Sequence, residues 1–386
     1  MELDYKEKVV FAEENWDRLD KIVQAGSDYE KLSKISLSFI VMDLTWRCNH
    51  NCRACIDGEA VNRKGDLPIE IIEDIFDYAN KYRIRGLMTM GGEVFLYKKG
   101  MKKALEKSIQ YKIPLKTVTN GTCLKSYIEE IVEAYKIPGS QLRVSINSDR
   151  KHYKEYTRNN IELEKVLEPI REITSRGTLV DVSTIIFPQE SKKNKAIPNI
   201  DQLESIIRDC EEIGVKHHVL ISGRDPKSRR MYKLSDEEKD KLRKIKRGNY
   251  ALELIDGTIL SEERIRHQNL NFSPCPSGFL FVLIGSNGKI YKCTDNRGRE
   301  DLVLGTIKKP GDFEKFWHSA ERVKKQMETK CKNKGCVRYK INVDLQTLRD
   351  VYEKYNVNLF GIMKLIPYEK VIEWYKKLKG EENFAV

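Results

Sequence analysis

The feature that most constrains the fold is a regular alternation of short apolar runs and amphipathic helical segments between residues 37 and 222. The apolar runs have the length expected of buried strands. They are Leu37–Asp43, Gly86–Met90, Leu115–Thr119, Gln141–Ile146, Leu179–Phe187 and Lys216–Ile221. Strands joined by helices pair in parallel, because a parallel neighbour needs a crossover connection. We therefore predict an α/β fold with a partial (β/α)6 barrel of the TIM type, an incomplete version of the eight-unit barrel.

Helical spacing of apolar residues supplies the crossovers between these strands. The first predicted helix begins near Pro68, and the later ones cover Lys102–Tyr111, Leu124–Tyr135, Glu162–Ser175 and Asn199–Ile213. In a barrel of this type the chemistry lies at the carboxyl ends of the strands. Three loops follow the first three strands and are expected at one rim: the Cys48–Cys55 loop, Gly91-Gly92-Glu93 and Thr119-Asn120-Gly121.

The rest of the chain divides by composition. Residues 1–36 read as a helical lead-in, 37–222 as the barrel and 223–272 as a charged connecting segment with a capping box at Ser235. Residues 273–340 form a small α+β module with four cysteines and a hairpin, Phe279–Ile284 and Lys289–Lys292, that turns at Gly288. Residues 341–386 read as a helical tail.

Charge and hydropathy narrow the class of protein. The 386 residues carry 70 basic and 58 acidic side chains, a net charge of +12. The lysines are scattered over amphipathic helices without a basic stripe interleaved with aromatics, so we expect a solvated surface rather than a nucleic-acid partner. The longest apolar runs are far too short to span a membrane, and the first ten residues lack the apolar core of a signal peptide. We expect a cytoplasmic protein with no membrane partner.

Nine cysteines point to metal or catalytic thiols. An odd number without an export signal argues against a disulfide framework. Cys48, Cys52 and Cys55 lie within eight residues. Three thiolates can ligate three irons of a four-iron cluster and leave the fourth iron open, whereas an electron-transfer cluster has four cysteine ligands. The alternative is a zinc site, with His50 as the fourth ligand.

The first cysteine loop resembles the C-x3-C-x2-C signature of the radical S-adenosylmethionine (SAM) superfamily. The resemblance implies a 4Fe-4S cluster whose open iron is chelated by SAM. Gly91-Gly92-Glu93 resembles the motif that receives the methionine amino group, and Ser145 and Asn147 resemble the fourth-strand contacts to ribose and carboxylate. Two positions depart from the family pattern without removing a ligand: Ala54 replaces an aromatic residue, and Val94 replaces a proline.

The second cysteine group resembles the opening of the SPASM and twitch auxiliary-cluster domains, C-x9–15-G-x4-C. Cys275, Gly288 and Cys293 have this spacing, and Cys331 and Cys336 follow. A full SPASM domain has seven cysteines, so four favour the shorter twitch form with one auxiliary 4Fe-4S cluster. A structural zinc on the same four cysteines is the alternative.

Several further side chains are candidates for contact with substrate. Cys123 follows the third strand and could return a hydrogen atom to a substrate radical, or could be a packed residue at the start of a helix. One of His217 and His218 should point into the barrel by strand alternation. Arg224 follows the last strand, and Cys210 is assigned to core packing.

These features and the resemblance imply a radical SAM enzyme that abstracts a hydrogen atom from its substrate. Four ligands on the second cluster leave no open iron, which suits electron transfer and a net oxidation of oxidoreductase type. Because only 36 residues precede the barrel, the substrate is expected to be a small molecule, or a peptide presented by another protein. An external donor such as flavodoxin or ferredoxin would supply the electron. The alternatives are peptide epimerisation or crosslinking and, from another class, a non-catalytic zinc- or cluster-binding regulator.

Overall fold

A single curved sheet of ten strands organises the computed structural model, which describes residues 16–53, 55, 65–225, 231–245, 251–254, 275–329 and 339–355. The strand order is β10-β9-β8-β1-β2-β3-β4-β5-β6-β7. The strands are β1 (Phe39–Thr45), β2 (Leu87–Gly91), β3 (Leu115–Thr119), β4 (Gln141–Ser145), β5 (Val180–Ile186), β6 (His217–Ser222), β7 (Ala251–Leu254), β8 (Phe281–Ile284), β9 (Lys289–Tyr291) and β10 (Val303–Thr306). The six strands predicted from the sequence are all present.

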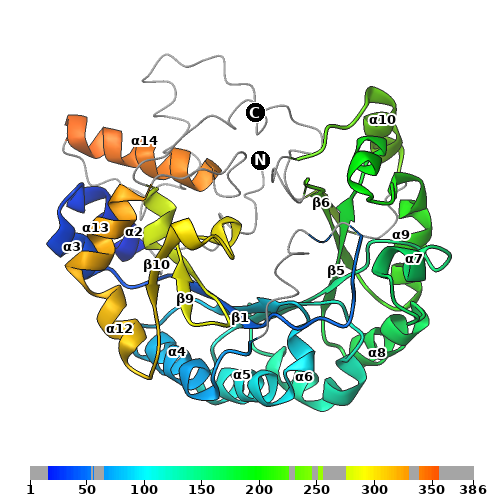
Figure 1. The fold of residues 1–386 in the computed structure, drawn as a ribbon, viewed down its shortest axis with the longest axis horizontal. Coiled ribbons are helices and arrows are strands. Elements are labelled where there is room, and N and C mark those ends of the chain that lie inside the picture. The colour runs from blue at the N-terminus through cyan, green and yellow to red at the C-terminus, as the bar shows by residue number, and fades with distance from the viewer. Residues whose placement is uncertain are drawn as a thin grey trace.

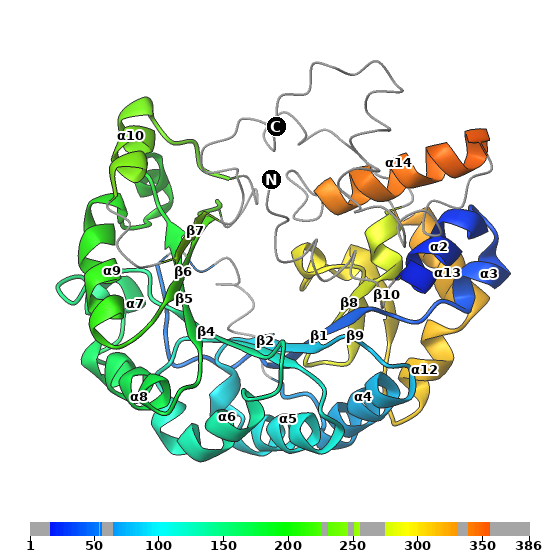
Figure 2. The same ribbon diagram turned by 180° about the vertical axis from the view of Figure 1, so that it is seen from behind.

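Parallel pairing runs without interruption from β8 through β1 to β7, whereas the pairs β8–β9 and β9–β10 are antiparallel. Figures 1 and 2 show the sheet as an open arc with a row of helices along its outer, convex side. These helices are α4 (Ile69–Lys81), α5 (Lys98–Tyr111), α6 (Ile128–Ala134), α8 (Glu164–Ser175) and α9 (Leu203–Glu212). The fold is therefore a partial TIM-type α/β barrel, as predicted.

The apolar core explains why the helices lie on the convex side. Every second residue of a strand faces one side of the sheet. In β1, Ile40, Met42 and Leu44 belong to the core cluster that includes Ile72 and Ile75 of α4. The opposite, concave face therefore carries Val41 and Asp43 of the same strand.

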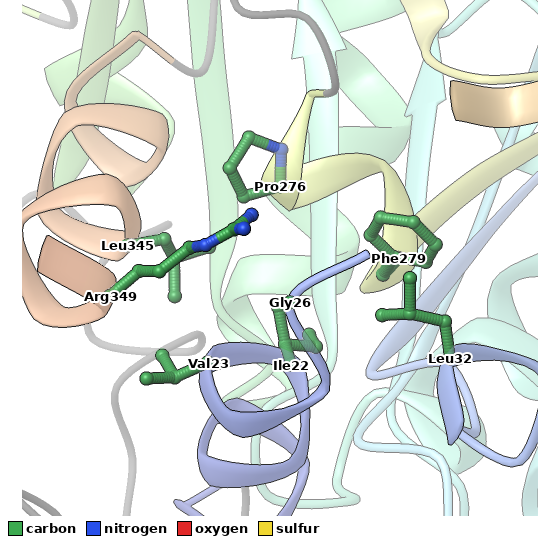
Figure 3. A pocket seen from close by; sticks show the side chains of 8 residues that line it. All are labelled: Ile22, Val23, Gly26, Leu32, Pro276, Phe279, Leu345 and Arg349. Atoms are coloured by element: carbon green, nitrogen blue, oxygen red, sulfur yellow. The ribbon is translucent and has the colours of Figure 1, made fainter. Parts of the chain in front are cut away.

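The concave face is covered over β8 and β1 by helices from both ends of the chain. They are α2 (Trp16–Ala25), α3 (Tyr29–Ser33), α13 (Ala320–Glu328) and α14 (Tyr339–Tyr355). Leu19, Val323 and Leu345 from these helices join Phe39 and Phe281 in a second core cluster. A small pocket of about 20 Å³ remains between α2 and α14, with Arg349 beside its apolar lining (Figure 3). Its volume admits about one water molecule.

Two strands pair directly with the six that the sequence predicts, β8 with β1 and β7 with β6. The predicted hairpin β8–β9 is present, and because β8 pairs with β1, it continues the barrel sheet. β7 lies in the segment 223–272, which was predicted as a connection only. Isolated apolar runs of about four residues carry too little periodicity to reveal their pairing partner.

Some helices match the sequence prediction, and others do not. The capping box at Ser235 and Glu238 opens α10 (Asp236–Lys244) as predicted. α7 (Tyr153–Thr157) was not predicted, because five residues are too few for a helical pattern. The predicted tail is helical from residue 341 to Tyr355, and residues 356–386 lie outside the described part. Among the described helices, none has the length and apolar character needed to cross a bilayer.

Gly288 is a glycine that the hairpin requires. Its φ is +73°, and a Cβ at this position would lie 2.3 Å from the Ile307 carbonyl oxygen. We expect Gly288→Ala to lower the free energy of unfolding by about 2 kcal/mol or more, because left-handed strain adds to a backbone clash. Urea unfolding should give this variant a clearly lower free energy of unfolding than Gly177→Ala. Gly177 is the matched control because it has a φ of +82° but no atom within 4 Å of an added Cβ. Equal losses in the two variants would contradict the prediction.

Candidate active site

The first cysteine loop leaves β1 at the carboxyl rim and is anchored on both sides. On one side, Asp66 accepts hydrogen bonds from Thr45 Oγ1 at 2.6 Å and from the Arg47 guanidinium at 2.7 Å. On the other, the backbone N–H groups of Asn51 and Arg53 donate to carbonyls of α7, Thr157 O at 2.9 Å and Tyr156 O at 3.1 Å. The short helix that the sequence did not reveal therefore fixes the middle of the loop.

Gly91 and Gly92 let the end of β2 lie directly against the backbone that leads to Cys48. Gly92 N donates to Thr45 O at 2.8 Å, and Glu93 N donates to Arg47 O at 2.7 Å. A Cβ on Gly91 would lie 2.2 Å from Thr45 O, and one on Gly92 would lie 2.3 Å from Arg47 O. In this structure both glycines are therefore required by the approach of the cysteine loop itself.

Glu93 is fully buried at the same rim, with 0% of its surface exposed. Its Oε1 accepts hydrogen bonds from Thr119 Oγ1 at 2.7 Å and from Phe95 N at 3.1 Å, and its Oε2 accepts one from Asn120 N at 2.6 Å. Burial raises the pKa of this carboxyl, and the three hydrogen bonds oppose the rise. Glu93 thus ties the end of β2 to the turn after β3.

Sequence reasoning placed the turn after β3 at the rim but missed what its polar side chains do. Asn120 Nδ2 donates to Asn49 Oδ1 at 2.8 Å and points to the Cys48 sulfur at 3.9 Å. Thr122 Oγ1 accepts from Asn49 Nδ2 at 2.8 Å. Asn159, just after α7, donates to the Asn49 carbonyl. The only sequence signal for these contacts was the position of the turn after a strand.

The three thiols fit a cluster with cysteine ligands. Burial, with a smaller contribution from the nearby Cys55 thiol, raises the pKa of Cys48 to about 11 and that of Cys52 to about 12. Each of these two thiols therefore needs a nearby positive charge to become a thiolate, a role that cluster iron would fill. The backbone N–H of His50 donates to Cys48 Sγ at 3.4 Å, and hydrogen bonds to sulfur are typical of cluster sites.

His50 was the proposed fourth ligand of the zinc alternative. Its side chain is buried, and its ring makes an edge contact with Tyr153 at 5.9 Å. Burial lowers the pKa of His50 to about 4. Within the described residues, no three His, Cys, Asp or Glu side chains converge as ligands of one metal ion; thiolates on a four-iron cluster each bind a different iron.

The other predicted SAM contacts lie on the neighbouring strand end. Ser145 is half-buried at the end of β4, on the same face of the strand as Asn147. Asn147 Oδ1 accepts a hydrogen bond from Ile185 N at 2.7 Å, and its carbonyl accepts one from Asn199 at 2.9 Å. Asn147 therefore joins β4 to β5, in addition to any contact with a ligand.

The isolated cysteines have different surroundings. Cys123 is half-buried before the turn η3 (Leu124–Tyr127), packs in part against the core and lies 3.8 Å from Thr122 Oγ1. Burial raises the pKa of its thiol. Cys210 lies on the buried face of α9 and is fully buried in the core, which confirms its packing role.

A charged layer crosses the concave face at the amino ends of β3 to β6. Asp181 accepts from the Arg143 guanidinium at 3.3 Å and from Gln141, and it lies 3.1 Å from His217 Nδ1. Burial raises the pKa of Asp181, but hydrogen bonds from His217 and Arg143 lower it overall. His217 thus faces the concave side, as one of the two histidines was predicted to do. Lys116 of β3 lies on the same, concave face of the sheet.

His218 points to the opposite face, where it contacts Thr184 Oγ1 at 2.7 Å. Burial lowers the pKa of His218 to about 3, so it is neutral at physiological pH. Strand alternation therefore separates the two histidines into one core residue and one concave-face residue.

Lys116 makes the stability of the fold depend on pH. Burial first, and the charge of Arg143 second, lower the pKa of Lys116 from 10.5 to about 7. Between these values the unfolded chain binds a proton that the folded chain does not, so this group makes the free energy of unfolding rise with pH. We expect Lys116→Met to reduce the slope between pH 7 and pH 9 by up to about 1.4 kcal/mol per pH unit. Urea unfolding at several pH values measures it, with exposed Lys125→Met as the control; equal slopes in both variants would refute the prediction.

Half of the second cysteine group is described. Cys275 precedes the turn η7 (Pro276–Phe279), and Cys293 precedes the turn η8 (Thr294–Asn296). Asn342 of α14 donates from Nδ2 to Cys275 Sγ at 3.4 Å and accepts from Ser277 N at 2.9 Å. Cys331 and Cys336 lie outside the described residues.

Comparisons with known proteins agree with this geometry. The family model for the Radical SAM superfamily matches residues 42–194. A curated relative, the probable GTP 3',8-cyclase of Pyrococcus abyssi, is 29% identical over 147 residues, which are 38% of this chain and 46% of the relative. The match thus spans about half the length of that relative.

Solved structures of similar fold extend the likeness beyond the matched segment. Streptococcus suis SuiB bound to the precursor peptide SuiA superposes with a TM-score of 0.57 at 15% identity, over 84% of this chain and 75% of SuiB. Native anSMEcpe with bound AdoMet and Cp18Cys peptide gives a TM-score of 0.51 at 15% identity, over 80% of this chain and 83% of that one. At such identities the likeness concerns the fold alone.

The matched segment runs from the second half of β1 through β5, and it contains the Cys48–Cys55 loop and the Gly91-Gly92-Glu93 segment. The rim geometry, the family match and the similar folds agree on this part of the chain. Residues 42–194 therefore match the Radical SAM superfamily in sequence, and they belong to a partial barrel.

Proposed function

We propose that the chain is a radical SAM enzyme in which Cys48, Cys52 and Cys55 hold a 4Fe-4S cluster with one open iron. The observation that carries the proposal is the position of these thiols. They lie on a loop at the carboxyl rim of a partial barrel. Hydrogen bonds join this loop to the Gly91-Gly92-Glu93 segment and to the turn at Asn120. When bound, the cluster and SAM would supply the radical chemistry by which a hydrogen atom is abstracted from the substrate.

The side chains around the loop would orient SAM. Glu93 Oε2 accepts one hydrogen bond from the described residues, donated by Asn120 N. A carboxylate oxygen has two lone pairs, so Oε2 can accept a second hydrogen bond from the methionine ammonium. Ser145 and Asn147, at the end of β4 on the concave side, would contact the ribose and the carboxylate. Gly91 and Gly92 keep the loop close to these groups.

A second 4Fe-4S cluster on Cys275, Cys293, Cys331 and Cys336, in a twitch-type module, completes the proposal. The spacing of the four cysteines and the contact from Asn342 to the Cys275 sulfur support it, since Asn342 follows Cys336 by only six residues. With four cysteine ligands this cluster would accept an electron from the substrate radical. The reaction is then a net oxidation of a small molecule or a peptide, with flavodoxin or ferredoxin as the electron donor.

Peptide epimerisation or crosslinking is the second candidate. Its support is the likeness in fold to SuiB and anSMEcpe, both solved with peptides bound. Cys123, half-buried at the rim beside Thr122, would be the hydrogen donor in an epimerisation. A non-catalytic zinc- or cluster-binding regulator is the candidate from a different class.

Anaerobic reconstitution separates these candidates. If the proposal is right, the reconstituted protein contains about eight irons per chain. It also forms 5′-deoxyadenosine when it is reduced with dithionite in the presence of SAM. A colourless zinc protein that leaves SAM intact would refute it. Transfer of deuterium from labelled candidate substrates into 5′-deoxyadenosine would then identify the substrate. Turnover without a change in its oxidation level would favour epimerisation over oxidation.

A further inference from the structure

The segment that follows Cys293 is joined to the barrel by two ion pairs. Arg297 Nε donates to Asp43 Oδ2 at 2.6 Å, and Arg224 contacts Asp295 at 3.4 Å. Asp43 belongs to β1, and Arg224 follows β6, at the other side of the arc. Residues 295–297 thus contact both sides of the barrel at once. In Figures 1 and 2 the chain that leaves β9 lies on the concave side of β1.

The Arg297–Asp43 pair is the more buried of the two. The side chains are 4% and 0% exposed, against 12% and 16% for Arg224 and Asp295. Removing one partner of a buried ion pair leaves an uncompensated charge, so such a contact is far more constraining than an exposed pair. An arginine that bonds through Nε to a carboxylate also fixes direction, which a lysine does not.

The sequence positions of this pair are informative. Asp43 lies five residues before Cys48, on the strand that leads into the first cysteine loop. Arg297 lies four residues after Cys293. The two residues are 254 positions apart in the chain. Their ion pair nevertheless connects the strand that leads into the first cysteine loop with the segment that follows Cys293. The parallel pairing of β8 with β1, from Phe39↔Phe281 to Met42↔Ile284, holds the same two parts together by backbone.

We infer that Arg297 and Asp43 are positioning residues that fix the second cluster relative to the SAM-binding cluster. The inference rests on the proposed function, because it requires both clusters. Backbone pairing of β8 with β1 sets the distance along the strands, and the ion pair fixes the loop that carries Cys293 beyond the end of β9. The charge of Arg297 would also stabilise the reduced form of the second cluster, since reduction adds negative charge.

The test compares Arg297→Met and Arg297→Lys with Arg176→Met in the full-length, reconstituted protein. Arg176 is the matched control because its pair with Glu129 is exposed. Pulsed electron paramagnetic resonance measures the distance between the two reduced clusters, and a redox titration measures the midpoint potential of the second one. In Arg297→Met we expect a broader distribution of distances and a lower potential. In Arg297→Lys we expect the potential to recover but the distribution to stay broad.

Unchanged distances and potential in Arg297→Met, equal to those of Arg176→Met, would overturn the inference. If Arg297→Met does not fold, Asp43→Asn removes the charge with little change in shape and should broaden the distribution in the same way; an unchanged distribution there is equally decisive. The failure of the proposed function looks different. Wild-type protein would then hold no second cluster, before any variant is compared, and the inference would fall with it.

Discussion

Cys52→Ala is expected to abolish cleavage of SAM and to lower the iron content by about four per chain. With one thiolate missing, the first cluster would have two protein ligands and would be lost. The fold should survive, because Cys52 is a small side chain at the edge of an apolar cluster with Tyr156 and Phe187. Iron analysis and quantification of 5′-deoxyadenosine under dithionite measure the effect, and the rate should fall by about three orders of magnitude or more.

Cys210→Ala is the matched control for this experiment. Cys210 is fully buried in the core, so its truncation should lower the free energy of unfolding by about 1 kcal/mol while iron content and SAM cleavage stay unchanged. If Cys52→Ala kept the iron and the activity of the wild type, the assignment of the first cluster would be wrong. The assignment would be equally wrong if Cys210→Ala lost the iron and the activity.

Gly92→Ala should have the second largest effect on SAM cleavage, because the added Cβ clashes with backbone atoms. The added Cβ would lie 2.3 Å from the Arg47 carbonyl oxygen and 2.7 Å from that of Trp46. Real Cβ atoms do not approach backbone this closely, so the loop that leads to Cys48 must move. We expect at least a tenfold loss in SAM cleavage, because a displacement of about 1 Å near reacting groups costs about a hundredfold in rate. The iron of the first cluster should also be retained less well.

Gly100→Ala provides the comparison for this variant. The atoms nearest to an added Cβ on Gly100 belong to the ring of Tyr97, at 2.2 Å, and that partly exposed side chain can turn away. Gly100→Ala should therefore keep its iron and most of its SAM cleavage. Equal activity in Gly92→Ala and Gly100→Ala would show that the approach of the two backbones does not matter for the site.

The role of Gly91 and Gly92 was only partly predictable. The sequence placed them after the second strand, in a segment that resembles the motif for the methionine amino group. The structure adds that their missing side chains admit the backbone of Thr45 and Arg47. A glycine pattern records that space is needed, but which atoms fill the space depends on the pairing of β1 with β2.

The charged layer of Arg143, Asp181 and His217 had no counterpart in the sequence reasoning beyond the alternation of His217 and His218. These residues lie on three different strands, and none belongs to a recognisable motif. Their contact arises from cross-strand register, which a single sequence does not specify. The same holds for the Arg297–Asp43 pair, whose residues are 254 positions apart.

By itself, the sequence determined the six strand–helix units, the rim on which the polar loops meet and the thiols of the first cysteine group. Each of these depends on local patterns: hydrophobic periodicity, and residue types at short spacing. Only the tertiary structure decided that the second module extends the barrel sheet through β8, that α7 and Asn120 hold the cysteine loop, and that Arg297 meets Asp43. These contacts join residues far apart in the chain, and they depend on the strand pairing that brings the segments together.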